Sequence, residues 1–195
     1  EGEQGNDVVG KGLPGYDDAL ELQTYDPQAA AQVFADKGVT SIEVLSAEVV
    51  AGINDSVTLL AQQLEPYGIS LNVTEVDPST IYTSNVGMIA QTQLFASYFI
   101  NRPFATHAPL YTAASSPYNF SAWKDEAYNE LIEQAAVTVD AQARQDLFDQ
   151  AQQALWADGG DVVWGFAYDL AAHVAGLTGV VMTQSIPLFA KAELA

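Results

Sequence analysis

The chain has 195 residues, no cysteine, and 25 acidic against six basic residues, for a formal net charge of -19 at pH 7. This balance excludes nucleic-acid binding, which needs clustered lysine and arginine, and the lack of cysteine excludes disulfides and thiolate chemistry. The hydrophobic content of 49% argues against disorder, and no apolar run approaches the roughly 18 residues of a membrane span.

Length and composition predict one domain, with at most an appendage and with a core of its own. The sequence begins at Glu1, without methionine, on a run rich in glycine and aspartate, and no signal peptide is visible. We therefore expect it to be the middle of a longer protein or a processed end.

Glycine and proline positions indicate a loop over residues 1–24 and a short helix after it. Asp26 can cap this helix, Pro27 suits its first turn, and Gly38 suits the position just past its end. The sequence therefore predicts a helix between Asp26 and Gly38.

A strand, a helix and a second strand are predicted next. Apolar and polar residues alternate over 40–46, and a similar pattern over 68–76 predicts a second strand. Between them, residues 53–65 carry an apolar stripe at helical spacing, and Pro66 ends or kinks this helix. This order predicts a βαβ unit with parallel strands and a right-handed crossover.

The second half of the chain predicts more helix than strand. Its predicted elements are, in order, a short helix (77–85), a strand buried on both faces (88–99), an irregular stretch (103–124), two amphipathic helices (125–137 and 140–157) and a strand (161–168). The tail from residue 176 shows no clear period.

Catalytic motifs are absent from the sequence. It holds no nucleophile elbow, no phosphate-binding glycine loop and no HExxH pair. His107 and His173 lie far apart without ligand spacing around them, and each is more typical of a structural or surface histidine than of a general base. We therefore predict no enzyme, no metal and no cofactor.

One stretch lacks the acidic residues that are abundant elsewhere. Pro78 to Lys124 contains no Asp or Glu, where an even spread would place about six (25 × 47/195). Arg102 lies within it among aromatic residues of a kind that lines pockets: Tyr98, Phe99, Tyr111, Tyr118 and Trp123. A packed strand and loop that exclude charge explain the stretch equally well. If it faces a ligand, Arg102 is the charged anchor and suits a carboxylate.

Four longer runs carry a resemblance to a known family: YDPQAAAQVFADKG, LLAQQLEPYGISLNV, YNFSAWKDEAYNELI and DAQARQDLFDQAQQAL. In this order they resemble the C-terminal portion of the extracytoplasmic solute-binding proteins of peptide, oligopeptide and nickel ABC importers (family 5 solute-binding proteins). FINRPF and ADGGDVV look closer to one subgroup of dipeptide-type binders. The resemblance rests on the order and spacing of these runs together, and it covers most of residues 6–180.

The resemblance implies an α/β fold of the periplasmic-binding-protein type (type II, large peptide-binder class), as a three-layer lobe with a central mixed sheet flanked by helices. Residues 1–15 would then be an incoming crossover segment, 16–180 the second lobe, and 181–195 a segment that returns to a first lobe. Residues 186–195 are expected to be weakly anchored without that lobe.

The resemblance also implies a function. It implies capture of a small-molecule or peptide ligand for an ABC importer, with a membrane permease as partner and an extracytoplasmic location, either periplasmic or lipid-anchored on the cell surface. The expected ligand-binding residues are Ser97, Tyr98, Phe99, Ile100, Asn101, Arg102 and Tyr118. The alternative is an interaction domain of the same fold that does not transport small solutes.

The sequence departs from the family at one position. Peptide-binding members carry, on the strand that matches residues 93–100, an aspartate that pairs with the amino terminus of the ligand. The aligned position here is near Phe99, within the stretch that lacks acids. We therefore hypothesise that Arg102 or the backbone of 97–101 faces the cleft, and that the ligand is not held by a free amine in this lobe.

Overall fold

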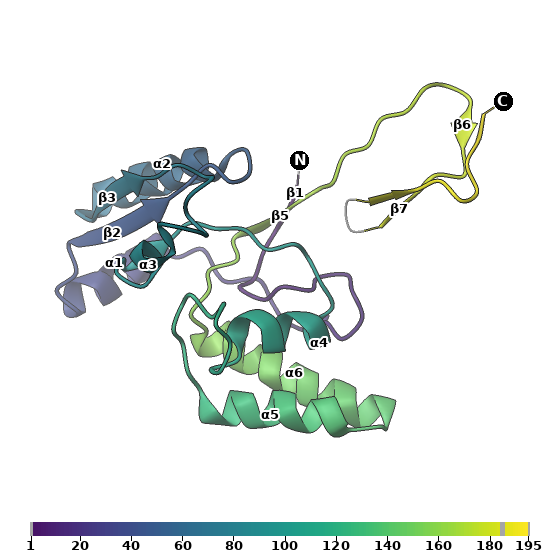
Figure 1. Cartoon of the computed structure of the whole chain (residues 1–195). Coiled ribbons are helices and arrows are strands. Elements are labelled where there is room, and N and C mark those ends of the chain that lie inside the picture. The colour runs from purple at the N-terminus through teal and green to yellow at the C-terminus, as the bar shows by residue number, and fades with distance from the viewer. Residues whose placement is uncertain (1, 184–185, 195) are drawn as a thin grey trace. The chain divides into compact units, whose positions relative to one another are not determined.

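The computed structural model describes residues 2–183 and 186–194, and the chain divides into two compact units. Unit 1 comprises residues 1–23 and 100–195, and unit 2 comprises residues 24–99. Unit 2 is therefore inserted, as one continuous segment, into the chain of unit 1 (Figure 1). Sequence length predicted a single domain, so this division is a finding of the structure.

Unit 2 is built around a three-stranded parallel sheet of order β3-β2-β4. Its elements are α1 (Pro27–Asp36), β2 (Ser41–Ser46), α2 (Ile53–Leu64), the short 3-10 helix η1 (Glu65–Tyr67), β3 (Ser70–Glu75), α3 (Val86–Ile89) and β4 (Leu94–Phe95). β2 pairs with β3 over six residues, which confirms the predicted strand, helix and parallel strand. Asp26 caps α1 as predicted, because its Oδ1 accepts the N–H of Ala29 at 2.9 Å.

Neighbouring residues of β2 place helices on the two faces of the sheet. Ser46 bonds Asn54 of α2, whereas Leu45 lines a pocket with Met88 of α3. Consecutive strand residues point to opposite faces, so α2 and α3 cover opposite sides of β2. The α/β class and the three layers are confirmed. The central sheet is parallel, whereas a mixed sheet was expected.

The strand predicted over 88–99 is wrong for most of its length. Val86–Ile89 is the helix α3, and only Leu94–Phe95 pairs with β2. Two side chains take the place of the missing strand: Thr92 Oγ1 donates to the carbonyl of Glu43 (2.9 Å), and Gln93 Oε1 accepts the N–H of Glu43 (2.8 Å). Because these side chains satisfy β2 at Glu43, an extended backbone beside it is not required.

The helix predicted over 77–85 is also wrong, because this segment is a series of turns. Asp77 starts the turns by accepting two hydrogen bonds from Ser79, one from the backbone N–H (2.8 Å) and one from the hydroxyl (2.6 Å). Short polar side chains of this type favour turns over helix interiors.

Unit 1 combines a helical part with short strands. Its elements are β1 (Gly2–Gln4), α4 (Phe104–His107), the π-helical turn η2 (Ala108–Thr112), α5 (Glu126–Val137), α6 (Ala141–Asp158), β5 (Gly165–Ala167), β6 (Leu177–Thr178), β7 (Val181–Thr183), β8 (Ile186–Leu188) and β9 (Glu193–Leu194). The two long helices match their predicted ranges, and Asp125 and Asp140 cap them. β5 is shorter than the strand predicted over 161–168.

The hydrophobic core of unit 1 lies where α4 and η2 meet α5 and α6. Its buried members are Val8, Phe104, Ala108, Ala113, Tyr128, Ile132, Ala135, Phe148, Ala151 and Leu155. Phe104 and Tyr128 are fully buried, and Phe104 packs edge-on against Phe148 with ring centroids 5.6 Å apart. Four helical segments, the loop before α5 and the incoming residue Val8 therefore share one core.

The irregular stretch predicted over 103–124 is wrong in its first part, since α4 and η2 are helical. Pro103 precedes α4, where proline is compatible with a helix start. Pro109 has no N–H to donate, and the turn around it closes with a wider bond from the N–H of Ala113 to the carbonyl of Ala108 (2.9 Å). The two prolines therefore shape the helix instead of excluding it.

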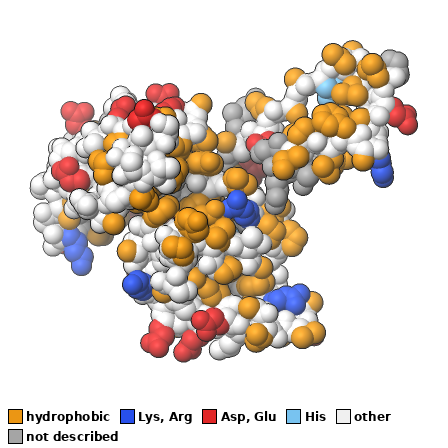
Figure 2. Space-filling model, in the orientation of Figure 1, with side chains coloured by type: hydrophobic (Ala, Val, Ile, Leu, Met, Phe, Trp, Pro, Cys, Tyr) orange, Lys and Arg blue, Asp and Glu red, His pale blue; other side chains and the backbone are white. Residues whose placement is uncertain are grey.

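The tail of unit 1, from residue 176 onward, is the part for which the sequence predicted least. Here β6 pairs with β9 and β7 with β8, in two antiparallel pairs that no periodicity predicted. Exposed apolar side chains cover this segment (Figure 2), among them Val181, Met182, Ile186, Leu188 and Phe189. Weak anchoring of residues 186–195 stays a prediction, and Ala195 lies outside the described residues.

Candidate functional site

The seven residues predicted to face a ligand fall on both sides of the boundary between the units. Ser97, Tyr98 and Phe99 end unit 2, whereas the other four belong to unit 1. We describe each group within its own unit. In both units, the predicted residues lie beside polar and aromatic groups that were not among the expected ligand-binding residues.

In unit 2, polar groups gather where the parallel strands end. β2 ends at Ser46 and β3 at Glu75, at the carboxyl edge of the sheet. The buried hydroxyl of Ser46 donates to Asn54 Oδ1 (2.6 Å), and Asn54 Nδ2 donates to Glu75 Oε2 (3.1 Å). Open α/β sheets bind ligands at this edge, so this chain of hydrogen bonds lies where a ligand site is expected.

Ser97 extends the same edge beyond β4. Its hydroxyl is 2.8 Å from the hydroxyl of Tyr82, and the Tyr82 ring packs edge-on against Phe95 with centroids 6.1 Å apart. Tyr98, the next residue, is 44% exposed and so is accessible to a partner. Tyr82 was not predicted. Its place in the acid-free stretch, beside other aromatics, was the only signal for it.

Glu48 also reaches the carboxyl edge. Its two carboxylate oxygens accept the backbone N–H groups of Gly52 (2.7 Å) and Asn54 (2.8 Å) at the start of α2. These hydrogen bonds lower the pKa of Glu48 below its ordinary value, and the bond from the N–H of Asn54 has the largest effect. Together with Glu75, it shows that carboxylates from outside residues 78–124 reach this edge. The acid-free stretch alone therefore does not remove every amine partner from unit 2.

In unit 1, Arg102 lies against an aromatic residue of η2. Its Nη1 donates to the Tyr111 hydroxyl at 2.8 Å, and its guanidinium carbon lies 5.5 Å from the centroid of the same ring. Further ring pairs continue from Tyr111 to His107 (5.0 Å) and to Tyr118 (6.2 Å). Tyr118 is 51% exposed. The structure thus joins two expected ligand-binding residues, Arg102 and Tyr118, through Tyr111, which the sequence singled out as a pocket-type aromatic but not as a ligand-binding residue.

His107 lies within this cluster but contributes no charge near neutral pH. It is 2% exposed, and burial, helped by the positive charge of Arg102, lowers its pKa to about 4. In the described part of the chain, the ion pair present is Lys11 with Glu3, so Arg102 has no acidic partner there. A half-buried guanidinium of this kind is suited to an anionic group such as a carboxylate.

Asn101 has a different role from Arg102, the next residue in the chain. Its Oδ1 accepts the N–H of Gly10 (2.8 Å), and its Nδ2 donates to the carbonyl of Lys11 (3.0 Å). Gly10 adopts a φ of +111°, and a Cβ there would lie 3.1 Å from the carbonyl oxygen of Arg102. Asn101 therefore holds the incoming segment against the backbone that carries Arg102. Ile100 is 45% exposed.

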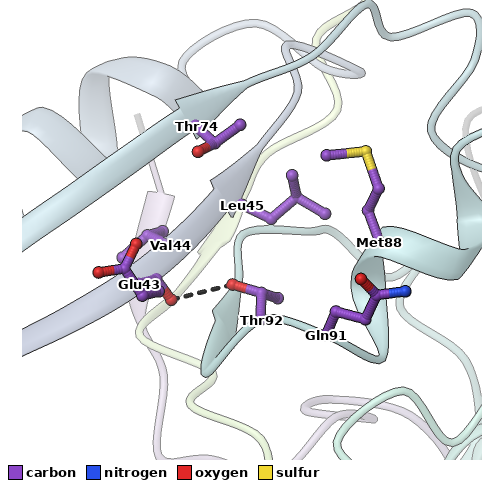
Figure 3. A pocket seen from close by; sticks show the side chains of 7 residues that line it. All are labelled: Glu43, Val44, Leu45, Thr74, Met88, Gln91 and Thr92. Carbon is purple, nitrogen blue, oxygen red and sulfur yellow. Dashed lines mark hydrogen bonds between the residues drawn. The ribbon is translucent and has the colours of Figure 1, made fainter.

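Two pockets of unit 2 lie away from these residues. The first, of about 200 Å³, is lined by residues of β2, β3 and the α3 segment: Glu43, Val44, Leu45, Thr74, Met88, Gln91 and Thr92 (Figure 3). The second, of about 260 Å³, lies between α1 and α2. Ligand pockets usually exceed about 300 Å³, and neither of these two contains a predicted site residue.

Metal binding and membrane insertion find no support in the residues that the structure describes. Among residues 2–183 and 186–194, no group of three or more potential ligand side chains could hold a metal ion. In the same residues, none of the helices combines the length and the hydropathy that a membrane span requires. The exposed His173 has Nδ1 3.0 Å from the carbonyl of Val174, its own neighbour in sequence.

Comparisons with known proteins relate the fold to solute-binding proteins. No family model matches the sequence, and no curated protein matches it. The chain is similar in structure to the periplasmic binding protein DppA of Helicobacter pylori in complex with the peptide STSA. Their TM-score is 0.75 at 18% identity, over 99% of this chain and 39% of that one.

Two further structures show the same relation. A dipeptide-binding protein of Pseudoalteromonas sp. SM9913, in complex with Met-Leu, has a TM-score of 0.72 at 14% identity, over 100% of this chain and 40% of that one. A nickel ABC transporter of Bacillus halodurans has a TM-score of 0.63 at 17% identity, over 81% and 37%. The chain therefore has the periplasmic-binding-protein fold and spans less than half the length of these structures.

Proposed function

We propose that this chain is the second lobe of a solute-binding protein of an ABC importer and that it helps to capture a peptide-like solute. One observation carries the proposal: nearly the whole chain matches about two fifths of two binding proteins in complex with peptides. Residues 1–15 and 181–195 would then be the segments that connect the lobe, 16–180, to a first lobe. The exposed apolar side chains of the tail support this, because a covering lobe would bury them.

In this proposal the protein binds its solute without chemical change. Two lobes close around the ligand, and the closed form is recognised by a membrane permease. Such a protein acts outside the cytoplasm, in the periplasm or lipid-anchored at the cell surface. A net charge of -19 supports a highly soluble surface for this role.

The proposed ligand-binding residues are Ser97, Tyr98, Phe99, Ile100, Asn101, Arg102 and Tyr118. Arg102 is the proposed anchor for a carboxylate of the solute, since no acidic side chain pairs with it in the described part of the chain. Tyr111 orients the guanidinium through its hydroxyl, and the exposed ring of Tyr118 offers an apolar face beside it. Asn101 supports this group through the backbone of residues 10 and 11.

Replacement of Arg102 tests the anchor. In the full-length protein, Arg102→Gln should weaken the binding of Met-Leu and of STSA about 10- to 100-fold, because a charge-assisted hydrogen bond to the carboxylate is lost. Titration calorimetry of both variants measures the effect. Arg144→Gln is the matched control, since Arg144 bonds the carbonyl of Thr138 at the turn between α5 and α6.

The results of these titrations distinguish solute capture from an interaction domain of the same fold. Unchanged affinity in Arg102→Gln would remove Arg102 from the site while leaving solute capture intact. If the full-length wild type binds neither peptide nor any small solute, that result favours the alternative function, an interaction domain of the same fold without a transport role.

A further inference from the structure

In unit 1, residues 2–7 (the incoming segment) and residues 161–167 (the outgoing segment) lie very close together. β1 and β5 pair antiparallel, and Gly5 continues the pairing by donating its N–H to the carbonyl of Trp164 at 3.0 Å (Figure 1). A Cβ built on Gly5 would lie only 1.9 Å from the carbonyl oxygen of Val163. The two backbones therefore leave no room for a side chain at this crossing, and their contact depends on a small separation.

Asp7 closes the crossing with its backbone and its side chain. Its N–H donates to the carbonyl of Val163 (3.3 Å), and its Oδ1 accepts the N–H of Val163 (2.9 Å). Asp7 reaches this position with a φ of +68°, which few residues other than glycine adopt. We call the three hydrogen bonds between Gly5 and Trp164 and between Asp7 and Val163 the crossover clamp.

A second carboxyl group, that of Asp161, lies two residues before Val163 of this clamp. Exposure alternates along the outgoing segment: Val162 and Trp164 are 72% and 70% exposed, whereas Asp161 and Val163 are partly buried. Asp161 is therefore on the same side of the segment as Val163, which bonds Asp7. Asp7, which accepts the N–H of Val163, therefore lies close enough to Asp161 for the two charges to interact.

Among residues 2–183 and 186–194, no basic side chain pairs with either of the two aspartates. The charge of Asp7 acts on Asp161, and the charge of Asp161 acts on Tyr128 of α5. Asp7 also accepts a hydrogen bond from the side-chain amide of Gln23. Lys11, the basic residue of the incoming segment, pairs with Glu3 at 3.0 Å. Burial, and next the charge of Asp7, raise the pKa of Asp161 to about 6, and burial raises the pKa of Asp7 as well.

We propose that Asp7 and Asp161 form a proton-holding carboxyl pair that makes the crossover clamp sensitive to pH. With one proton on the pair, the two segments carry a single negative charge and the clamp is tight. When that proton is lost, two carboxylates repel each other across the crossing and the clamp loosens.

The direction follows from the carboxyl groups. A carboxyl that is harder to ionise in the folded protein favours the folded form below its folded pKa, and this advantage is lost as the pH rises through about 6. The clamp is therefore tight at pH 5 and loose at pH 7.5. If residues 1–15 connect this lobe to a first lobe, as the proposed function holds, the same pair makes the attachment of that connecting segment to this lobe depend on pH. The clamp itself does not rest on that function.

Hydrogen exchange of this 195-residue chain tests the proposal. The amides of Gly5, Asp7 and Val163 should lose about tenfold in protection factor between pH 5 and pH 7.5, after correction for intrinsic exchange rates. In Asp161→Asn the loss should vanish, because the variant cannot ionise. Asp7→Asn should also remove it, and asparagine keeps a side-chain oxygen for Val163 and tolerates a positive φ.

Asp158→Asn is the matched control, since it removes the same charge from an exposed position at the end of α6. It should retain the wild-type pH dependence. The proposal is overturned if wild-type protection does not change between the two pH values, or if both asparagine variants at 7 and 161 keep the wild-type change. The carboxyl carbon of Asp161, followed by NMR, should titrate near pH 6 in the wild type and lower in Asp7→Asn.

Discussion

Phe104→Ala should destabilise unit 1 by about 3–5 kcal/mol, a large share of the stability of a domain this size. Phe104 is fully buried and packs on Phe148 within the core that joins α4 to α6. Removing its ring leaves a cavity in this packed core, which the surrounding side chains fill only in part. Urea unfolding followed by tryptophan fluorescence measures the loss, because Trp123, Trp156 and Trp164 all belong to unit 1.

Phe189→Ala provides the comparison, since Phe189 is 61% exposed in the tail. The same change of side chain should alter the unfolding free energy by no more than about 0.5 kcal/mol. A loss below about 1 kcal/mol in Phe104→Ala would contradict the packing described for this core.

Gly5→Ala should open the crossing of the incoming and outgoing segments. The new Cβ would lie 1.9 Å from the Val163 carbonyl oxygen, and because that oxygen belongs to the backbone, the segments must separate. The hydrogen bond from Gly5 to Trp164 is then lost. We expect a cost of about 1–3 kcal/mol and at least about tenfold faster hydrogen exchange over residues 3–7 and 163–167.

Gly87→Ala is the control for this change. Gly87 lies in α3, and a Cβ there meets no atom within 4 Å. Alanine favours a helix over glycine, so this variant should be neutral or slightly stabilising. If hydrogen exchange over residues 3–7 and 163–167 is as slow in Gly5→Ala as in the wild type, the close approach of the two segments is refuted.

The long elements could be predicted because their signals are local. Asp26, Asp125 and Asp140 each cap a helix, and the alternation over 40–46 marks a strand that is paired on both sides. The strand predicted over 88–99 failed because Thr92 and Gln93 satisfy the backbone of Glu43 with their side chains. That contact joins residues about fifty positions apart, and no local pattern reports it.

The candidate site was predictable in part for the same reason. Composition drew attention to Arg102 and Tyr118, and the structure links them through Tyr111. Glu75 and Asn54 were missed, because they come to the carboxyl edge from β3 and α2, outside the acid-free stretch. The crossover clamp was missed as well, since Asp7 and Val163 are 156 residues apart in the chain.

The most direct test of the proposed function is a crystal structure of the full-length protein with the solute that it retains from its host cell. We predict a solute enclosed between a first lobe and this one, in contact with residues among 97–102 and 118, and with a carboxylate on Arg102. A solute amine paired with Glu75 or another acid of this lobe would contradict the hypothesis that no amine is held here. A solute that touches none of these residues would contradict the proposed site altogether.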